Sequence, residues 1–498
     1  MKRIIKNIDI LFQFFLKREL KFVVVSVLAI FIFSKSELGA QAAFDTSFTV
    51  DSIIISGNKK TKTGVIMREL EFGLNDTITD RELEVLLDKS RSNLLNMPLF
   101  NFVYIDTVQN SEHGRTVNIK VEERWYTWPI FTIDPIDRNL NAWIRTRDIS
   151  RVNIGLGVEK YNFLGLNHKV YAKTIFGYGN SFSFAYNDAY IGKNRVHALS
   201  FYANSVHKKT LDYDIVNDKP VTIKFQDKNA IEYTNFAIGY KYRKKINNSH
   251  IVYLNYKEYK IDETLFELNS KYLNGQNKSI AYFDISYNFH YTKKDSRSYP
   301  LKGQEVMFSA TKSGLGIIKN SGVNQLSIKT EYSQYSQIYK RLYLASKITC
   351  KKNFGNNDNF LFRTGLGYGD KLRGYEHYLI NSTGFVLLNT DLKFEIIKPK
   401  VFLLEMNGIK KYENIYHSVR KFSKIPYSVY VNFFADAAYA SDDDKNSEYK
   451  NNVLVNSFIM SYGAGINIVT YYDLVIRLEF AVNKFKETGV ILNFTAPF

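Results

Sequence analysis

The chain has 498 residues, of which 45% are hydrophobic and 15% aromatic, with 36 Tyr and 37 Phe against only 8 Pro. So many large rings exclude an intrinsically disordered or low-complexity chain, and the length allows a sizeable core. The 67 Lys and Arg outnumber the 49 Asp and Glu, which gives a formal net charge of +18. Because the basic residues are scattered and regularly followed by acidic ones, we expect no nucleic-acid partner.

Motifs of catalysis and of metal or cofactor binding are absent from the sequence. The single cysteine, Cys350, excludes an intrachain disulfide and a cysteine-rich metal cluster. The histidines lack the helical pairing of a zinc protease, and neither a Walker A sequence nor a nucleophile elbow occurs. Gly365, Gly367 and Gly369 are not followed by a helix, so we predict that they share one face of a strand. We therefore expect no enzyme activity, no cofactor and no metal site.

The N-terminus is typical of an exported protein. A basic segment covers residues 1–21 and an uncharged apolar run covers residues 22–33, too short to span a bilayer comfortably. Ala40 and Ala42 then place small residues where a signal peptidase reads them, so we predict a signal peptide over residues 1–42, with a signal anchor as the alternative. No later stretch approaches a membrane-spanning helix, so an exported membrane protein of this sequence must span as a barrel.

A small α/β module is predicted over residues 47–124. Thr79 and Glu82 are spaced as a capping box, and apolar residues after them follow a helical period. The predicted elements are a strand over 48–56, helices over 62–71 and from Thr79 to about Met97, and strands over 102–108 and 116–121.

This β-α-α-β-β order resembles a POTRA domain, as do GNKKTK after the first strand and NLLNMPLFNFVYIDTV before the second strand. The resemblance implies a periplasmic module that binds unfolded clients or partner subunits along a sheet edge. An exposed edge offers unpaired backbone groups to any extended peptide. The alternative is an ordinary small domain that acts as a spacer.

Residues 125–498 show short alternating runs separated by polar turns. Phe182, Phe184 and Tyr186 alternate with small residues, and the apolar run from Leu474 to Phe480 includes Arg477 and Glu479. Charges on one face of otherwise apolar strands are typical of a transmembrane antiparallel β-barrel with a wet lumen. The length predicts roughly sixteen strands. The first barrel strand is either 127–134 or 152–160.

Three longer polar insertions are predicted to be extracellular loops, namely residues 207–229, 405–425 and 441–453. The end of the chain carries an alternating apolar pattern with an aromatic last residue. It resembles the C-terminal signal by which outer-membrane barrels are recognised, although Pro497 departs from that pattern and removes one backbone donor. The residues of this predicted signal are Val490, Leu492, Phe494, Ala496 and Phe498.

A loop motif narrows the family. Leu372, Arg373, Gly374 and Tyr375 follow a predicted strand near residues 360–369. They resemble the Arg-Gly-aromatic motif of the BamA/TamA outer-membrane assembly family, whose loop folds into the lumen and docks its Arg on a carboxylate of the wall. The matching wall motif is Phe434-Ala435-Asp436, so the resemblance implies a pair of Arg373 with Asp436. Only arginine offers a planar fork to a carboxylate in such a lumen.

Two further segments fit the same family. Residues 295–303, DSRSYPLKG, resemble its turn segment with Arg, Pro and Gly, and residues 162–165, NFLG, resemble an early strand-turn motif. The chain has one POTRA-like module where the housekeeping assembly factors have several. The resemblance therefore implies an accessory or shortened paralogue.

The resemblance implies an outer-membrane protein with its N-terminal domain in the periplasm, which assists insertion, assembly or translocation of other proteins. The expected partners are unfolded or nascent outer-membrane or secreted proteins, other subunits of an assembly complex and outer-membrane lipid. Client transfer would use a weak seam between the first and last barrel strands. Two alternatives stay open: a passive porin with an N-terminal spacer, and a soluble exported β protein that binds glycans.

Overall fold

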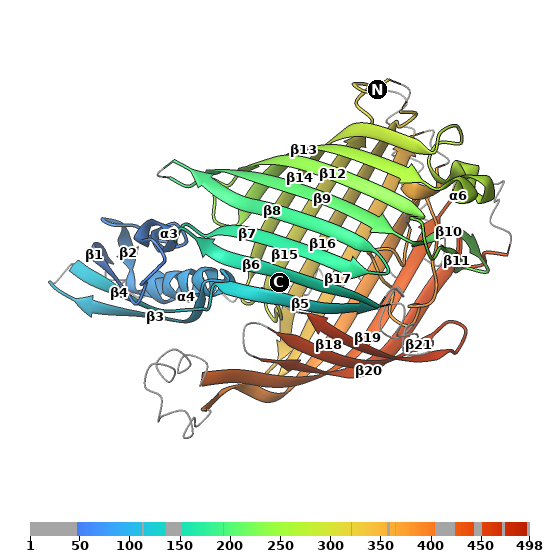
Figure 1. Cartoon of the computed structure of the whole chain (residues 1–498). Helices are drawn as coiled ribbons and strands as arrows, with labels where there is room; N and C mark the ends of the chain where they lie inside the picture. The colour runs from blue at the N-terminus through green and yellow to red at the C-terminus, as the bar shows by residue number, and fades with distance from the viewer. Residues whose placement is uncertain are drawn as a thin grey trace, which may run out of the picture.

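The computed structural model describes residues 47–111, 114–135, 152–192, 194–319, 321–355, 359–363, 365–403, 424–442, 451–470 and 474–495. A small α/β module lies at one end of a large curved antiparallel sheet (Figure 1). The predicted fold class, mainly β with one small α/β module before a barrel, is confirmed. The predicted signal segment, with Ala40 and Ala42, lies outside the described residues and stays a prediction.

The N-terminal module packs two helices against a four-stranded sheet of order β2-β1-β4-β3. Val50, Ile66, Leu94 and Phe100 are fully buried in its core. Because the sheet ends in β3, one full-length strand presents an unpaired edge. The elements are β1 (Ser47–Ser56), α3 (Thr63–Met67), β2 (Thr77–Thr79), α4 (Asp80–Asn96), β3 (Phe100–Gln109) and β4 (Gly114–Glu123).

The capping box is present at the start of α4. The Thr79 side chain accepts from the backbone N–H of Glu82, and the Glu82 carboxylate accepts from that of Thr79. Two details differ from the prediction. The strand β2 was not predicted, because three residues are too few to show a periodic pattern. It is recognised only by its pairing with β1. The first helix is shorter than 62–71, because three-residue turns after Met67 direct Leu70 into the core.

The large sheet has sixteen strands in chain order, which confirms the predicted number. Both candidates for the first barrel strand are strands, and β5 is the first. The sixteen are β5 (Thr127–Pro135), β6 (Val152–Phe163), β7 (His168–Gly177), β8 (Asn180–Ile191), β9 (His197–Lys208), β12 (Ile231–Tyr242), β13 (Asn248–Ile261), β14 (Ser279–Lys294), β15 (Gly303–Ser313), β16 (Gln325–Tyr339), β17 (Leu342–Gly355), β18 (Gly384–Leu403), β19 (Lys424–Ser441), β20 (Phe458–Val469), β21 (Val475–Asn483) and β22 (Thr488–Thr495).

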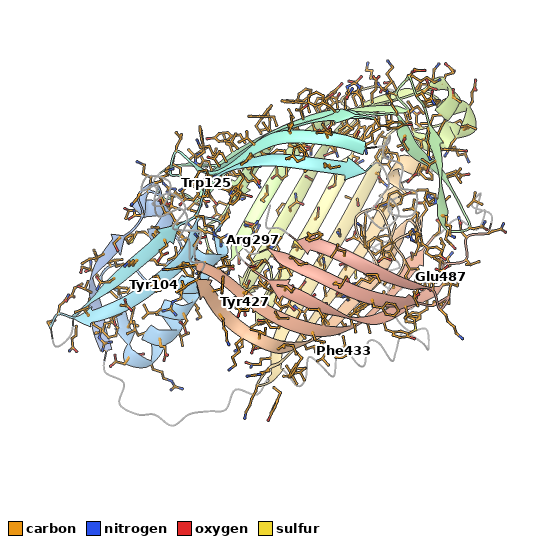
Figure 2. The ribbon with its side chains drawn as sticks, turned by 60° about the horizontal axis from the view of Figure 1, so that its bottom comes forward. Tyr104, Trp125, Arg297, Tyr427, Phe433 and Glu487 are labelled. Atoms are coloured by element: carbon orange, nitrogen blue, oxygen red, sulfur yellow. The ribbon has the colours of Figure 1, made fainter. Side chains whose placement is uncertain are left out.

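Side chains alternate across the sheet as a lipid-facing barrel requires. On β21, Phe480 is 49% exposed on the outer face, whereas Glu479 is 5% exposed on the inner face. The same alternation places apolar and aromatic residues outside along the other strands, and Phe433 is one example (Figure 2). Within the described residues, none of the helices combines the length and apolarity needed to cross a bilayer.

The end of the barrel opposite the module is covered by irregular structure (Figure 1). It consists of the hairpin β10 (Thr210–Val216) and β11 (Lys219–Lys224), α6 (Glu263–Leu268), and the 3-10 turns η2 (Ser270–Tyr272) and η3 (Phe360–Phe362). The predicted loop 207–229 thus contains a hairpin, whose Ile215 is buried against α6 and η2.

The prediction of a strand over residues 360–369 is wrong. Residues 360–369 form no strand, because Gly367 has a φ of +99° and the β17 ladder ends at Gly355. The three glycines therefore do not share a strand face. Residues 405–425 were predicted to be extracellular. Residues 404–423 lie outside the described residues, so the side of this loop stays a prediction. The described strand end at Lys424 contacts the module, with its Nζ 3.1 Å from Glu122 Oε1.

The module docks on the adjacent rim of the barrel through polar contacts. Arg243, in the β12–β13 turn, donates to both Glu69 carboxylate oxygens at 2.6 and 2.8 Å. Asn96 Nδ2 donates to the Lys294 carbonyl at 2.9 Å. At Gly165 the two parts touch so closely that a Cβ would lie 2.2 Å from the Lys60 carbonyl oxygen. The module is therefore held in one orientation.

Removing the Arg243 side chain should loosen this docking. Arg243→Ala leaves the Glu69 carboxylate, only 4% exposed, without its cation. Breaking a buried pair in this way costs about 3–5 kcal/mol. We expect faster amide hydrogen exchange in residues 66–72 of the full chain in detergent. Lys245→Ala, in the same turn but exposed, should change nothing. Equal exchange in both variants would contradict a docking role for the pair.

Candidate functional site

The loop between β17 and β18 folds back into the barrel. Leu372 and Tyr375 are buried there against Phe385, Leu387 and the end of β20. Gly374, between them, has a φ of +82°, which a residue with a Cβ rarely adopts. This turn points the side chain of the intervening residue, Arg373, at the barrel wall.

Arg373 bonds to Asp436 in the geometry that the resemblance implied. Its Nε donates to Asp436 Oδ2 at 2.8 Å, and its Nη2 donates to Asp436 Oδ1 at 2.6 Å. The guanidinium carbon also lies 3.8 Å from the centroid of the Phe434 ring, over its face. Both residues of the predicted wall motif therefore contact the arginine, Asp436 through a two-pronged ion pair and Phe434 through a cation–π contact.

Two further carboxylates complete the arginine's surroundings. Arg373 Nη1 lies 2.8 Å from Asp391 Oδ1 and 3.1 Å from Glu479 Oε1. The Asn432 amide donates to these same two oxygens, at 3.2 and 2.9 Å. One guanidinium thus joins carboxylates from β18, β19 and β21. Without it, these acidic groups would repel one another inside the barrel.

The same loop also contacts the last hairpin of the barrel. Asn483 Nδ2 donates to the Gly374 carbonyl at 3.0 Å, and Lys484 N donates to the Tyr375 hydroxyl at 3.0 Å. Further along, the Tyr378 hydroxyl donates to Glu487 at 2.9 Å. The loop therefore holds the β21–β22 turn, which lies at the end of the barrel opposite the module (Figure 2).

A second group of lumen residues comes from the segment 295–303. This segment is the β14–β15 turn, and Figure 2 places its Arg297 at the module's end of the barrel. Tyr299 from this turn enters the lumen and packs on Tyr430, with ring centroids 4.8 Å apart. The Tyr299 hydroxyl accepts from Asn467 at 3.0 Å, and the Lys393 ammonium lies 4.1 Å from the Tyr299 ring centroid. The segment 162–165 covers the end of β6 and the start of the β6–β7 turn, where Gly165 contacts the module.

The predicted C-terminal signal is only partly described. Val490, Leu492 and Phe494 lie on the outer face of β22. Ala496, Pro497 and Phe498 lie outside the described residues, so their contribution stays a prediction.

Sequence reasoning missed Asp391, Glu479 and Asn432 as partners of Arg373, and it missed the ties from Tyr378 to Glu487 and from Asn483 to Gly374. The signal that could have found the two carboxylates is an acidic residue on the inner face of an otherwise apolar strand. That signal does not predict which of the acidic residues contact the same arginine. The described residues contain no group of three or more His, Cys, Asp or Glu side chains able to hold a metal ion.

Fold and site together define an outer-membrane β-barrel with a lumen-docked loop and a periplasmic POTRA module. The Omp85 superfamily domain matches residues 162–494, and a POTRA model described as a surface antigen variable number repeat matches residues 48–124. The chain therefore belongs to the Omp85 superfamily. This family acts in protein assembly or translocation at the outer membrane and is not enzymatic, which confirms the expected general role and the absence of catalysis.

Among solved structures, the chain is similar to BamA from Haemophilus ducreyi lacking POTRA domains 1–3, at 16% identity, TM-score 0.47, and coverage of 90% of this chain and 83% of that one. CdiB from Escherichia coli has 11% identity, TM-score 0.47, and coverage of 93% and 91%. CdiB from Acinetobacter baumannii has 9% identity, TM-score 0.46, and coverage of 90% and 73%. No protein with a curated description matches the chain.

Substitution of Arg373 should destabilise the barrel. Arg373→Ala leaves three carboxylates close together without a cation, which should cost about 3–5 kcal/mol of unfolding free energy. Arg373→Lys should recover only part of this loss, because an ammonium cannot bond two carboxylate oxygens side by side. The measurement is urea unfolding in detergent, followed by heat-modifiability on a gel. Lys371→Ala removes an exposed positive charge from the same loop and should leave the midpoint unchanged. Wild-type stability of Arg373→Ala would disprove the role.

Proposed function

We propose that this protein captures unfolded client proteins in the periplasm and assists their insertion into, or translocation across, the outer membrane as an accessory or shortened paralogue of the assembly factors. Client chains bind first to the POTRA module and then meet the seam between β5 and β22. The partners are nascent outer-membrane or secreted proteins.

The observation that carries this proposal is the open edge of the barrel sheet. The sheet order begins at β22 and ends at β5, with no ladder between these two strands in the described residues. Residues on β22 are exposed on both faces, Val490 outside and Asn493 inside. Unpaired backbone groups in a membrane are costly, so such an edge favours pairing with an incoming strand.

The free edge of β3 supports the first step. Within the described part of the chain β3 pairs only with β4, and its Tyr104, 43% exposed, lies on the surface of the module (Figure 2). An extended client segment can add to this edge through backbone hydrogen bonds with little regard to its sequence.

In this proposal the Arg373 network is a positioning device. It fixes the lumen loop, and the loop fixes the β21–β22 turn through Asn483 and Tyr378. The outer end of the seam strand β22 is thereby held while its other end stays free to pair with a client.

A photo-crosslinking experiment tests the seam. A benzoylphenylalanine in place of Val490 should crosslink to an unfolded outer-membrane client presented to proteoliposomes, because a client strand would lie along β22. The matched control is Ile466, 46% exposed on the outer face of β20, which is paired on both sides. Crosslinking of equal yield at both positions would refute entry at the seam.

Conductance distinguishes this role from the passive porin. We expect a small, unsteady conductance in planar bilayers, because Arg373 and Tyr299 hold polypeptide inside the lumen. Deletion of residues 47–124 should abolish client insertion in the same proteoliposomes. A large, steady conductance that the deletion leaves unchanged, together with no client insertion, would favour the porin.

A further inference from the structure

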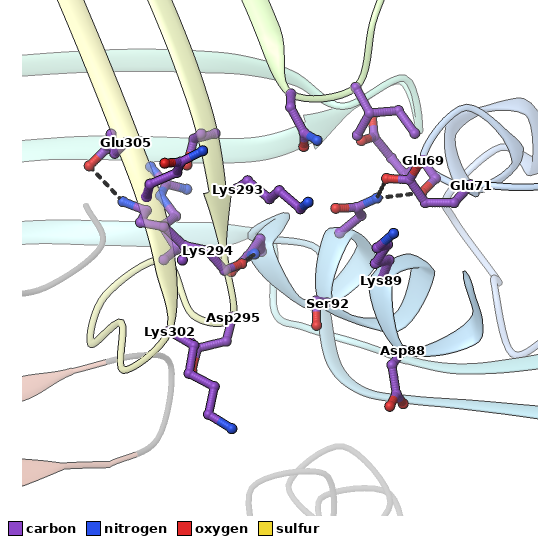
Figure 3. Close-up of a pocket in the computed structure, with 18 of the residues that line it drawn as sticks. Glu69, Glu71, Asp88, Lys89, Ser92, Lys293, Lys294, Asp295, Lys302 and Glu305 are labelled. Atoms are coloured by element: carbon purple, nitrogen blue, oxygen red, sulfur yellow. Dashed lines mark hydrogen bonds and ion pairs between the residues drawn. The ribbon is translucent and has the colours of Figure 1, made fainter. Parts of the chain in front are cut away.

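A cleft of about 930 Å³ lies between the module and the rim of the barrel. Helix α4 forms one wall, and the β12–β13 and β14–β15 turns form the other (Figure 3). Neither the Arg373 network nor the free edge of β3 belongs to it. The cleft is lined by charged groups of both signs and by the apolar side chains of Val85, Met97 and Ile246.

The acidic groups of the cleft are all bonded within the protein. Glu69 is paired with Arg243, and Glu71 accepts from Asn93. Asp88 is paired with Arg91, and Glu305 with both His290 and Lys294. Asp295 accepts from the backbone N–H groups of Ser296 and Leu301. These carboxylates are therefore already neutralised or fixed by neighbours.

Several basic groups of the same cleft are not matched. Lys89 on α4, Lys293 at the end of β14, and Arg297 and Lys302 in the β14–β15 turn all line it. None of the four makes a hydrogen bond or an ion pair through its side chain with another described residue. Figure 3 shows Lys293 extending from the barrel side toward α4, where Lys89 lies. The cleft therefore has an excess of positive charge that its own carboxylates do not balance.

We propose that this cleft binds an extended acidic segment of an unfolded client chain on its way from the module to the barrel. Asp or Glu side chains would pair with Lys89, Lys293 and Lys302, and apolar side chains between them would cover Val85 and Ile246. This inference rests on the proposed function, because it takes the bound chain to be a client. It adds a preference for acidic sequence that backbone pairing on β3 cannot supply.

A polypeptide fits this site better than an anionic lipid. One wall of the cleft is helix α4 of the periplasmic module, so a headgroup there would leave its acyl chains beside polar groups such as Asn93 and Asn96. The apolar lining is confined to a few side chains, which suits residues of a peptide and not a hydrocarbon chain.

Fluorescence anisotropy on the full-length protein in detergent tests the proposal. The probe is a labelled twelve-residue peptide of alternating Glu and Ser, and the comparison peptide replaces each Glu by Lys. We expect the acidic peptide alone to bind, and its affinity to fall as salt is raised. Reversal of three charges, Lys89→Glu, Lys293→Glu and Lys302→Glu, should weaken binding by about tenfold or more.

The matched control reverses three exposed lysines elsewhere, Lys59, Lys120 and Lys340, with the same change in net charge. The control should keep wild-type affinity. Equal loss in both triple variants, or no loss in the cleft variant, would overturn the proposal. So would anionic vesicles that bind through the three cleft lysines when the peptide does not. If the reversed variant does not fold, as judged by heat-modifiability, the Lys→Gln triple replaces it.

The outcome is separable from that of the proposed function. Peptide binding at equilibrium requires no insertion activity, so intact insertion without acidic-peptide binding would disprove the cleft alone. Binding that depends on the cleft lysines, without any client insertion, would instead disprove the proposed function.

Discussion

The barrel depends on one buried cation. Arg373 enters the lumen on a glycine turn and meets Asp436, Asp391 and Glu479 from three strands, with the Phe434 ring beneath its guanidinium. Burying this many charges is unfavourable unless the geometry satisfies each of them, and the planar fork of arginine does so for Asp436 at both oxygens. The loop that carries it also contacts the last hairpin, at Asn483 and Glu487.

A second arginine fixes the other end of the molecule. Arg243 and Glu69 come from the barrel and the module, far apart in the sequence, and they join at the rim next to the close contact at Gly165. The module therefore holds β3 and the cationic cleft in one fixed orientation relative to the barrel. Both stand in a defined relation to the mouth of the barrel, as the proposed transfer of a client chain from one to the other requires.

The seam follows from the topology. Each strand between β6 and β21 has a neighbour on both sides, whereas β5 and β22 have one each in the described residues. An antiparallel meander has two terminal strands. Each of them keeps one unpaired edge unless the two strands pair with each other. The strand β22 is short and exposed on both faces. Opening the sheet at this strand would therefore break the fewest backbone hydrogen bonds.

The sequence by itself determined the elements whose signal is local. Alternation predicted the barrel, and the length of the chain predicted roughly sixteen strands. The spacing of Thr79 and Glu82 predicted the start of α4, and the resemblance of residues 372–375 and 434–436 implied the pair of Arg373 with Asp436. Periodicity depends on only a few neighbouring residues, so it can be detected in a single sequence.

Only the tertiary structure decided which distant residues meet. In the sequence, Asp391 and Glu479 are only two acidic residues on the inner face of their strands. The strand register brings both of them to the guanidinium of Arg373. The cleft at Lys89, Lys293 and Lys302 exists only because the module docks against the rim. Contacts of this kind depend on how the whole chain closes in space, and no local pattern encodes that closure.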